Sequence, residues 1–512
     1  MSTASITEYR SGLQGAPDRF SSVLRAEWTK FRTVRGWVIG ILIAALVTAG
    51  IALLDHSECG GPNGAACTSP VGPAGEAVTD SFYFVHQPLA VNGSITARMT
   101  ALTAMAAGQS GLAPWTKAGI IIKASTRPGS AYAAMMLTGS HGVRMQYDYT
   151  ADIAGMPGRV SAASPRWLRL TRSGDTVTGY DSADGTAWTV VGTAHLTGLP
   201  ATVQAGMFAT SPGTTVPGSR SLTGSSSGGA LSLATGVFDH VSLRGGQAAG
   251  AWTGSGIGGG GAGFAGPGTS AGYHQAGGSL TVTGTGDIAP VVAGNGDGTP
   301  VEQLLTGVFG GLIAVIVVAA MFMTAEYRRG LIRVTLAASP RRGRVLAAKA
   351  VVIGSVSFLA GLAGAVVALA AGEPLLRSNG NYILPVSTLT DVRVMAGTAA
   401  LVAVTAILAV ALGALLRSSA AAITIAITVV VLPYLLGQTV LPAGAADWVL
   451  RITPAAAFAI QQTTPQYPQV TASYTPAQGY FPLAPWAGFA VLCAYAALAL
   501  GLAVVILRRR DA

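Results

Sequence analysis

The stretch EYRRGLIRVTLAASPRRGRVLAAK, residues 326–349, decides how this chain is arranged. It lies between two long apolar runs and carries seven basic residues against one acidic residue. Basic residues close to the ends of membrane spans stay on the cytosolic side. The stretch is therefore interpreted as a cytosolic loop that sets the orientation of the spans on either side of it.

Six apolar runs are each long enough to cross a hydrocarbon core of ~30 Å as a helix. The chain has 512 residues, of which 50% are hydrophobic, and a mean hydropathy of +0.51, which is too hydrophobic for an ordinary soluble protein. We expect a polytopic α-helical membrane protein with six transmembrane helices. The six runs are residues 36–54, 304–325, 350–372, 394–416, 418–441 and 486–507.

The apolar runs contain no Asp, Glu, Lys, Arg or His. Ion-driven carriers need ionisable groups at membrane depth, so the sequence disfavours that class. A P-loop requires G-x-x-x-x-G-K-[ST], and the chain has no Gly-Lys pair. We therefore expect no catalytic residue, cofactor or metal in this chain, and any ATP to be bound by a separate subunit.

The net charge of +10 is concentrated in the termini and loops predicted to be cytosolic. This positive excess faces anionic lipid headgroups, so membrane lipid is an expected partner and nucleic acid is not needed to explain the charge. The pattern predicts a multi-pass plasma-membrane protein with both termini in the cytosol.

Residues 1–35 are predicted to form a cytosolic N-terminus with an amphipathic helix over 18–35. Apolar side chains recur there at helical spacing, flanked by basic ones, which suits a helix lying in the membrane interface. An alternative is a basic flank that only precedes the first span. The apolar positions include Phe20, Leu24, Trp28 and Phe31.

Residues 78–245, predicted to lie outside the membrane, change to short alternating segments separated by turn residues. In VRMQYDY, residues 143–149, apolar and polar side chains alternate as in a half-buried strand. The preceding outer loop, 55–77, contains Cys59 and Cys67, for which a disulfide and two free thiols are both open. A Gly-rich linker is predicted over 246–303, with one short strand possible at LTVTG, residues 280–284.

The loop residues resemble a known family. Glu326, Gly330, Leu336, Ser339 and Pro340, followed by two arginines, are similar to the first intracellular loop of type-2 ABC exporter permeases. The resemblance implies a coupling helix that docks on an ATPase subunit, and a second permease copy in a homodimer or heterodimer. Alternatively, the arginines only anchor the topology. The implied coupling residues are Glu326, Arg328, Arg329, Gly330, Arg333, Ser339, Pro340, Arg341 and Arg342.

The outer domain also carries familiar motifs: DSFYFVHQPL, PWTKAGIIIKAS, PRWLRLTRSGD and DGTAWT, in this order. They look like a concanavalin A-like lectin/glucanase jelly roll, which implies two stacked antiparallel sheets and a cell-surface glycan as a candidate ligand. A spacer or protein-contact domain is equally compatible. A hydrolase is disfavoured, because no glutamate occurs from 77 to 301. The glycan-binding candidates are Tyr132, His141, Arg144, Gln146, Tyr147 and Tyr180.

Residues 304–512 would hold the remaining five spans and an outer segment, 442–485. Its stretch TPAAAFAIQQTTP is too short to span. The family resemblance implies re-entrant helices there, and a surface loop packed on the β-domain is the alternative. The function expected is a permease subunit of an ABC exporter powered by a separate ATPase. The alternative is a membrane-anchored glycan-binding or sensory protein without transport activity.

Overall fold

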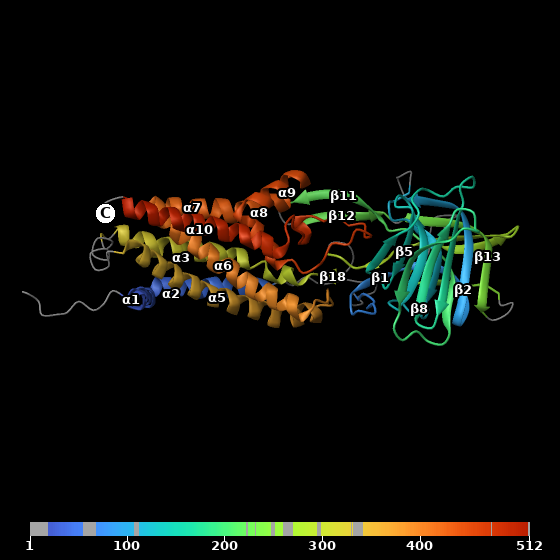
Figure 1. The fold of residues 1–512 in the computed structure, drawn as a ribbon. Coiled ribbons are helices and arrows are strands. Elements are labelled where there is room, and N and C mark those ends of the chain that lie inside the picture. Colours follow the sequence, from blue (N-terminus) through green and yellow to red (C-terminus); the bar gives the residue numbers. More distant parts are fainter. Residues whose placement is uncertain are drawn as a thin grey trace, which may run out of the picture.

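The computed structural model places a helical bundle and a β-sandwich end to end (Figure 1). The residues that it describes are 19–54, 68–106, 112–221, 224–230, 232–246, 251–259, 270–293, 298–328, 330, 341–472 and 474–509.

Six helical segments within the described residues are long and apolar enough to span a membrane, which confirms the expected fold class. They follow α1, Phe20–Thr33, which is helical as predicted. The second is preceded by a short 3-10 helix, η2, at Val301–Leu305. The spans are α2 (Arg35–Leu53), α3 (Val308–Arg328), α5 (Arg342–Ser378), α6 (Thr388–Leu416), α7 with α8 (Ser419–Val430 and Leu432–Thr439) and α10 (Pro485–Arg509).

Small residues bring the first three spans into close contact. Thr48 of α2 is buried, and a Cβ added at Gly311 of α3 would overlap its hydroxyl. A Cβ at Gly364 of α5 would lie only 2.9 Å from the Thr48 Cβ. In lipid, helices associate through such close packing, because the hydrophobic effect contributes little to the free energy of association there.

The outer segment 442–485 forms α9 (Ala443–Ile452) and two 3-10 helices, η3 (Pro454–Gln461) and η4 (Pro476–Gln478). All residues of η3 are buried between α6 and α10. A Cβ added at Gly397 of α6 would overlap Ile460, and one at Gly488 of α10 would overlap the Ala456 carbonyl oxygen. η3 is thus wedged between α6 and α10.

The β-domain is an antiparallel sandwich, as the lectin-like resemblance implied. β2 (Phe82–Ala106) runs through both sheets, so the strand pairing is continuous. In the front sheet, the start of β2 lies between β14 (Thr253–Ile257) and β10 (Val203–Thr210). From β10 the sheet continues in the order β3 (Lys117–Lys123), β4 (Tyr132–Thr138), β5 (Val143–Tyr147) and β6 (Ala151–Ala154). In the back sheet, the rest of β2 lies between β7 (Arg166–Ser173) and β13 (Ser232–Gly246). β8 (Thr176–Ser182) and β9 (Thr189–His195) follow β7 on one side, and β16 (Ser279–Thr285) and β15 (Gly272–Ala276) follow β13 on the other.

The main core of the domain lies between the two sheets. Ile120 and Met135 of the front sheet and Leu168 and Val282 of the back sheet belong to one fully buried cluster. Gly179 of β8 faces the sulfur of Met135, where a Cβ would come within 2.6 Å. A separate hairpin, β11 (Thr214–Ser221) and β12 (Gly224–Ala230), lies outside this sandwich.

The described parts of residues 246–303 differ from the predicted linker. They contain β14, β15 and β16, together with β17 (Ile288–Pro290) and β18 (Gly298–Thr299). The expected strand at 280–284 is confirmed as part of β16, and its Leu280 and Val282 are buried in the core. Glycine content predicts flexibility only where no neighbouring strand pairs with the backbone, and here β13 and β2 supply that pairing.

The chain enters and leaves the sandwich through a two-stranded ribbon. β1 (Val78–Asp80) pairs antiparallel with β17, with Val78 opposite Pro290 and Asp80 opposite Ile288. Val78 and Ile288 lie in a buried cluster with Phe84 and Phe208, on the face of the front sheet that points away from the main core. The ribbon therefore covers that face and links it to the first two spans.

Candidate functional site

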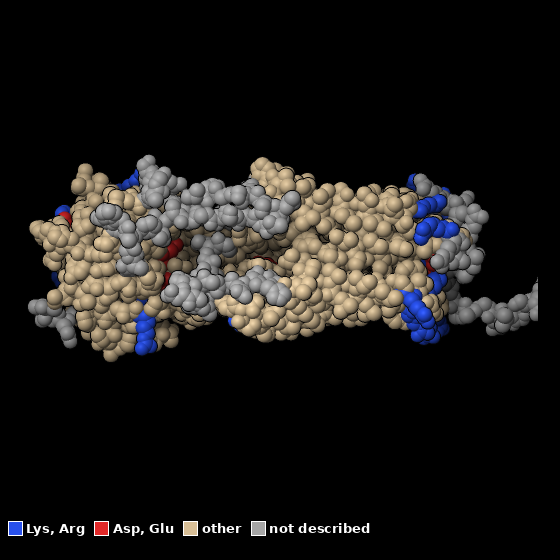
Figure 2. Space-filling model, turned by 180° about the vertical axis from the view of Figure 1, so that it is seen from behind, with Lys and Arg blue, Asp and Glu red and all other residues tan. Residues whose placement is uncertain are grey.

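On the face of the bundle that Figure 2 shows, lysines and arginines gather mainly at the end far from the β-domain, and the side between the two ends shows almost no charge. We call this the basic end. Here α1 lies beside the bundle, α3 ends, α5 begins and α10 ends. The described residues of the segment 326–349, which are 326–328, 330 and 341–349, lie at the same end, and Glu326 and Lys349 contact charged side chains of the N-terminal helix there.

Four buried or partly buried charges join α1, α3 and α5 at the basic end. The Lys349 ammonium nitrogen lies 2.6 Å from Oε2 of Glu27 and 2.8 Å from Oε1 of Glu326. Lys30 donates to the other oxygen of Glu27 at 2.7 Å and to Glu326 at 2.9 Å. Two lysines and two glutamates thus form one cluster, in which their four formal charges cancel.

Burial makes this cluster tight. The Lys349 side chain is 0% exposed, and its ammonium group lies 4.5 Å from the ring centroid of Phe322. Phe31 and Trp37 pack against the same ring at centroid distances of 5.9 and 5.0 Å. Burial acts to lower the pKa of Lys30, but hydrogen bonds and charge from Glu27 and Glu326 outweigh it and raise that pKa. Lys30 therefore stays charged.

The predicted coupling residues separate into two groups. Glu326 is 5% exposed, and its Oε1 accepts hydrogen bonds from Lys30 and Lys349. Arg341 lies exposed just before α5, and Arg342 donates to the backbone carbonyl of Leu507 in α10. Gly330 has a φ of 66°, a conformation that favours glycine. Arg328 ends α3, and Arg329, Arg333, Ser339 and Pro340 lie outside the described residues.

Sequence reasoning did not identify Glu27 and Lys349 as members of the charge cluster around Glu326. Glu27 is the one acidic residue among the basic side chains of α1, and Lys349 is one of only four lysines in the chain. Lys349 directly precedes the apolar run 350–372, and Glu27 lies on the amphipathic helix before the first run. A charge placed there needs a partner, because burying it alone is costly, and that rule could have drawn attention to them.

At the other end of the bundle, two buried ion pairs fasten the ribbon to β3. Lys117, at the start of β3, donates to Asp287 at 2.7 Å and to the Ile288 carbonyl at 2.8 Å. Lys123, at the end of β3, lies 2.7 Å from Asp80 of β1. Both lysine side chains are 0% exposed. One strand thus holds both arms of the ribbon.

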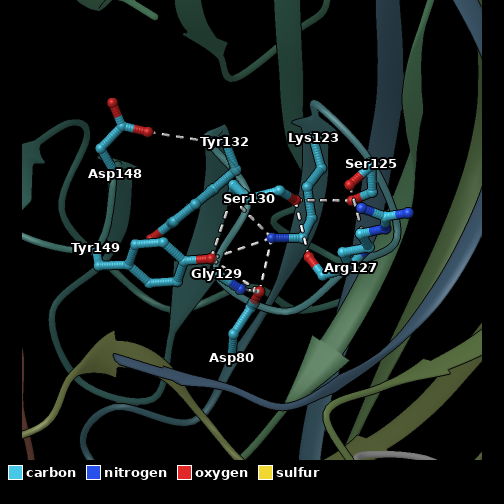
Figure 3. Close-up of polar contacts among 9 residues, drawn as sticks. All are labelled: Asp80, Lys123, Ser125, Arg127, Gly129, Ser130, Tyr132, Asp148 and Tyr149. Carbon is cyan, nitrogen blue, oxygen red and sulfur yellow. Dashed lines mark hydrogen bonds and ion pairs between the residues drawn. The ribbon is translucent and has the colours of Figure 1, made fainter. Parts of the chain in front are cut away.

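Asp80 is the centre of a wider polar cluster (Figure 3). Its Oδ2 accepts hydrogen bonds from Lys123 at 2.7 Å, the Gly129 amide at 2.8 Å and the Tyr149 hydroxyl at 2.8 Å. Burial and the nearby Asp80 charge raise the pKa of Tyr149, so its hydroxyl stays protonated and donates. Tyr149 has a φ of 62°, and the cluster holds this uncommon conformation in place.

The ribbon continues into contacts with the outer loops of the bundle. Ala289, Val292 and Ala293 pack with Val470 and Tyr480 in a buried cluster. The Ala293 amide donates to the Tyr480 hydroxyl at 3.0 Å. β18 also pairs in parallel with β19 (Tyr382–Ile383), in the loop between α5 and α6. The β-domain and the outer ends of the spans are therefore packed as neighbours through this ribbon.

Gln469 adds a direct contact between the outer segment and the sandwich. Its side-chain amide donates to the Thr150 carbonyl at 2.9 Å, next to strained Tyr149. Below this contact, Glu302 of η2 accepts a hydrogen bond from the Thr463 hydroxyl. The rings of Tyr434 and Phe458, 4.4 Å apart, pack beneath them in the outer half of the bundle.

The glycan-binding candidates do not form one site. Tyr132 and Gln146 are buried at 0% and 1% exposure, and Tyr180 lies on the back sheet. Tyr147 is half-buried and packs against the main core. Only two converge on a common surface point: His141 stacks on Trp115 at 4.0 Å, and the Arg144 guanidinium carbon lies 5.8 Å from the same ring. Glycan binding stays a prediction, and Cys59 and Cys67 lie outside the described residues.

The fold and the basic end define a class: a multi-pass membrane protein with a β-sandwich inserted between its first two spans. A model of the ABC-2 family transporter proteins matches residues 22–512. The chain belongs to this family and is a membrane-spanning permease component of an ABC transporter, a class that works with an ATP-binding subunit. No curated protein matches the chain in sequence.

Several solved structures resemble part of the chain at low identity, and their TM-scores are too low to carry an argument. A functionally unknown protein from Saccharomyces cerevisiae is 14% identical, with a TM-score of 0.22 over 36% of this chain and 94% of its own. Scytalido-glutamic peptidase is 7% identical, with a TM-score of 0.26 over 42% and 100%. The chain spans about a quarter of the GH43 protein BlXynB from Bacillus licheniformis, at 16% identity, a TM-score of 0.21 and coverage of 30% and 28%.

Proposed function

We propose that this chain is the permease subunit of an ABC exporter, driven by a separate ATPase that docks on the loop 326–349. Its basic end and both termini face the cytosol, since basic residues at span ends favour that side. The β-domain then lies outside the cell. Six spans form half of a transport pathway, so two permease copies pair with two ATPase subunits.

The observation that carries this proposal is the four-charge cluster at the basic end. Glu326 is the first residue of the loop and Lys349 is the last. Glu326 pairs with Lys30 of α1, Lys349 pairs with Glu27 of α1, and the two also pair with each other. A buried ion cluster resists separation, because breaking it would leave charges without partners. A displacement of the loop would therefore move the end of α3, the start of α5 and α1 together as one rigid unit.

Movement of α3 would reach the outer side through η2, which continues into the ribbon at β18 and β17. The ribbon packs against Val470 and Tyr480 of the outer segment. This supports a role for the β-domain at the outer opening, in contact with a cell-surface glycan or another partner during export. A membrane-anchored glycan-binding or sensory protein would not need this coupled movement of α1, α3 and α5.

The test compares Arg329→Glu, in the loop, with Arg509→Glu, at the same end but outside the loop. The full chain is purified from its native membrane in mild detergent, and partners are identified by mass spectrometry. We expect an ATPase with a P-loop to co-purify with the native chain and with Arg509→Glu, and to be lost from Arg329→Glu. Recovery of no ATPase, under conditions that preserve other membrane complexes, would overturn the proposal in favour of the anchored protein.

A second measurement addresses coupling. In vesicles containing the permease and its ATPase, Arg329→Glu should lower transport and substrate-stimulated ATP hydrolysis together. The outward movement of a substrate from the ATP-containing side establishes the exporter direction. If the loop variant hydrolyses ATP and transports as the native complex does, the loop is only a topological anchor.

A further inference from the structure

A cavity of about 930 Å³ lies at the basic end, where α1, the start of α5 and the end of α10 meet. Four arginines line it: Arg341, Arg342, Arg344 and Arg508. Gly343, between two of them, faces Val504 of α10, and an added Cβ would make an ordinary contact with it at 3.4 Å. The start of α5 and the end of α10 both contribute arginines to this one cavity.

The remaining wall of this cavity is apolar and includes Phe20 and Val504. A second groove, of about 400 Å³, is lined by Leu24, Trp28 and Val351, among others. It belongs to the same two helices, α1 and α5.

The spacing places the cavity and the groove one after the other along α1 and α5. Residues four apart on a helix lie one above the other on one face. Phe20, Leu24 and Trp28 on α1 follow this spacing, and Ala347, Val351 and Ser355 repeat it on α5. The lining residues of both helices therefore lead from the arginines of the cavity to the mainly apolar groove.

We propose that the cavity and the groove together bind an anionic phospholipid, with its phosphate among the arginines and an acyl chain between α1 and α5. Guanidinium groups bind phosphate through paired, charge-assisted hydrogen bonds. Basic pockets between helix ends are a known setting for anionic headgroups. The mainly apolar groove distinguishes a lipid from a free phosphate and from an acidic side chain of a partner protein, neither of which would use it.

Bound lipid would fasten α1 to α5 and α10 beside the four-charge cluster. It would therefore support the arrangement of the basic end, whichever partner binds the loop. The inference rests on the cavity and its walls and is independent of the proposed transport direction.

The test uses the purified full chain, without an ATPase, in phosphatidylcholine bilayers. Spin-labelled phosphatidylglycerol and spin-labelled phosphatidylcholine are compared by the fraction of each that the protein immobilises. We expect several-fold selectivity for phosphatidylglycerol. The double substitution Arg344→Gln with Arg508→Gln should reduce that selectivity to within about twofold of phosphatidylcholine, because it removes two of the four guanidinium groups.

A matched control removes the same charge at the same end. Arg32 and Arg509 are exposed and do not line the cavity, so Arg32→Gln with Arg509→Gln should keep the selectivity. Val351→Trp, which fills the groove without changing charge, should lower the immobilised fraction of phosphatidylglycerol.

Three results would overturn the proposal. The first is that the native chain shows no selectivity for phosphatidylglycerol over phosphatidylcholine. The second is that both double variants lose this selectivity to the same extent, which would indicate a diffuse attraction between charges. The third is displacement of the labelled lipid by millimolar inorganic phosphate, which would identify a free-phosphate site. If the arginine variant fails to fold, the Val351→Trp comparison with native protein still decides the outcome.

Discussion

Lys349→Met is expected to destabilise the bundle by about 3–5 kcal/mol, the usual cost of removing one partner from a buried ion pair. The Lys349 nitrogen lies 2.6 and 2.8 Å from two carboxylates, and the side chain is 0% exposed. Methionine is close in length, so little of the effect would come from an empty cavity. The variant leaves Glu27 and Glu326 with Lys30 alone, whose side chain is 39% exposed.

Combining Lys349→Met with Glu27→Gln should recover part of this loss. The double variant is neutral again, and Lys30 still lies 2.9 Å from Glu326. Side chains in one ion network couple by about 0.5–3 kcal/mol, so the double variant should be more stable than the sum of the single effects predicts. Thermal unfolding of the full chain in detergent, followed by the circular dichroism of its helices, measures all three variants.

The control for this series is Arg377→Met. Arg377 pairs with Glu373 at 3.1 Å on the same helix, but its side chain is 58% exposed. Exposed pairs contribute about 0–1 kcal/mol, so this variant should unfold close to the native chain. The reasoning is refuted if Lys349→Met costs no more than Arg377→Met, or if the Lys349 and Glu27 effects simply add.

Three further outcomes are expected. Burial lowers the pKa of His86 in the folded chain, so the unfolded chain binds more protons at this residue. The contribution of the neutral His86 ring to the free energy of unfolding is therefore complete above about pH 6.5, and it is lost as the pH falls through the lowered pKa. Acid unfolding curves of native chain and His86→Gln would check this, and identical pH dependence would contradict it. Lys123→Met should destabilise the sandwich by about 3–5 kcal/mol by leaving Asp80 buried without its cation, seen as faster proteolysis of the β-domain than in native chain. Gly488→Leu should cost about 1–3 kcal/mol by overlapping η3, whereas Gly501→Leu, on the same helix in open space, should leave the melting temperature nearly unchanged.

Much of the architecture was predictable from the sequence. Six uncharged runs of span length predict six membrane helices, because a bilayer admits only backbone that satisfies its own hydrogen bonds. The alternating segments of 78–245 predict strands for an equally local reason, since a half-buried strand needs every second side chain apolar. Both patterns depend only on residues close together in the sequence, and the structure confirms the six helices and the strands that they predict.

The partners of the buried charges were decided only by the tertiary structure. Lys349 and Glu27 are 322 positions apart, and Lys117 and Asp287 are 170 apart, so no local pattern joins them. The strands in 246–303 were hidden for the same reason, because their glycine-rich backbone is ordered by pairing with β13 and β2. Local periodicity determines which element forms, but the partner of a buried charge or an edge strand is chosen by how distant segments pack.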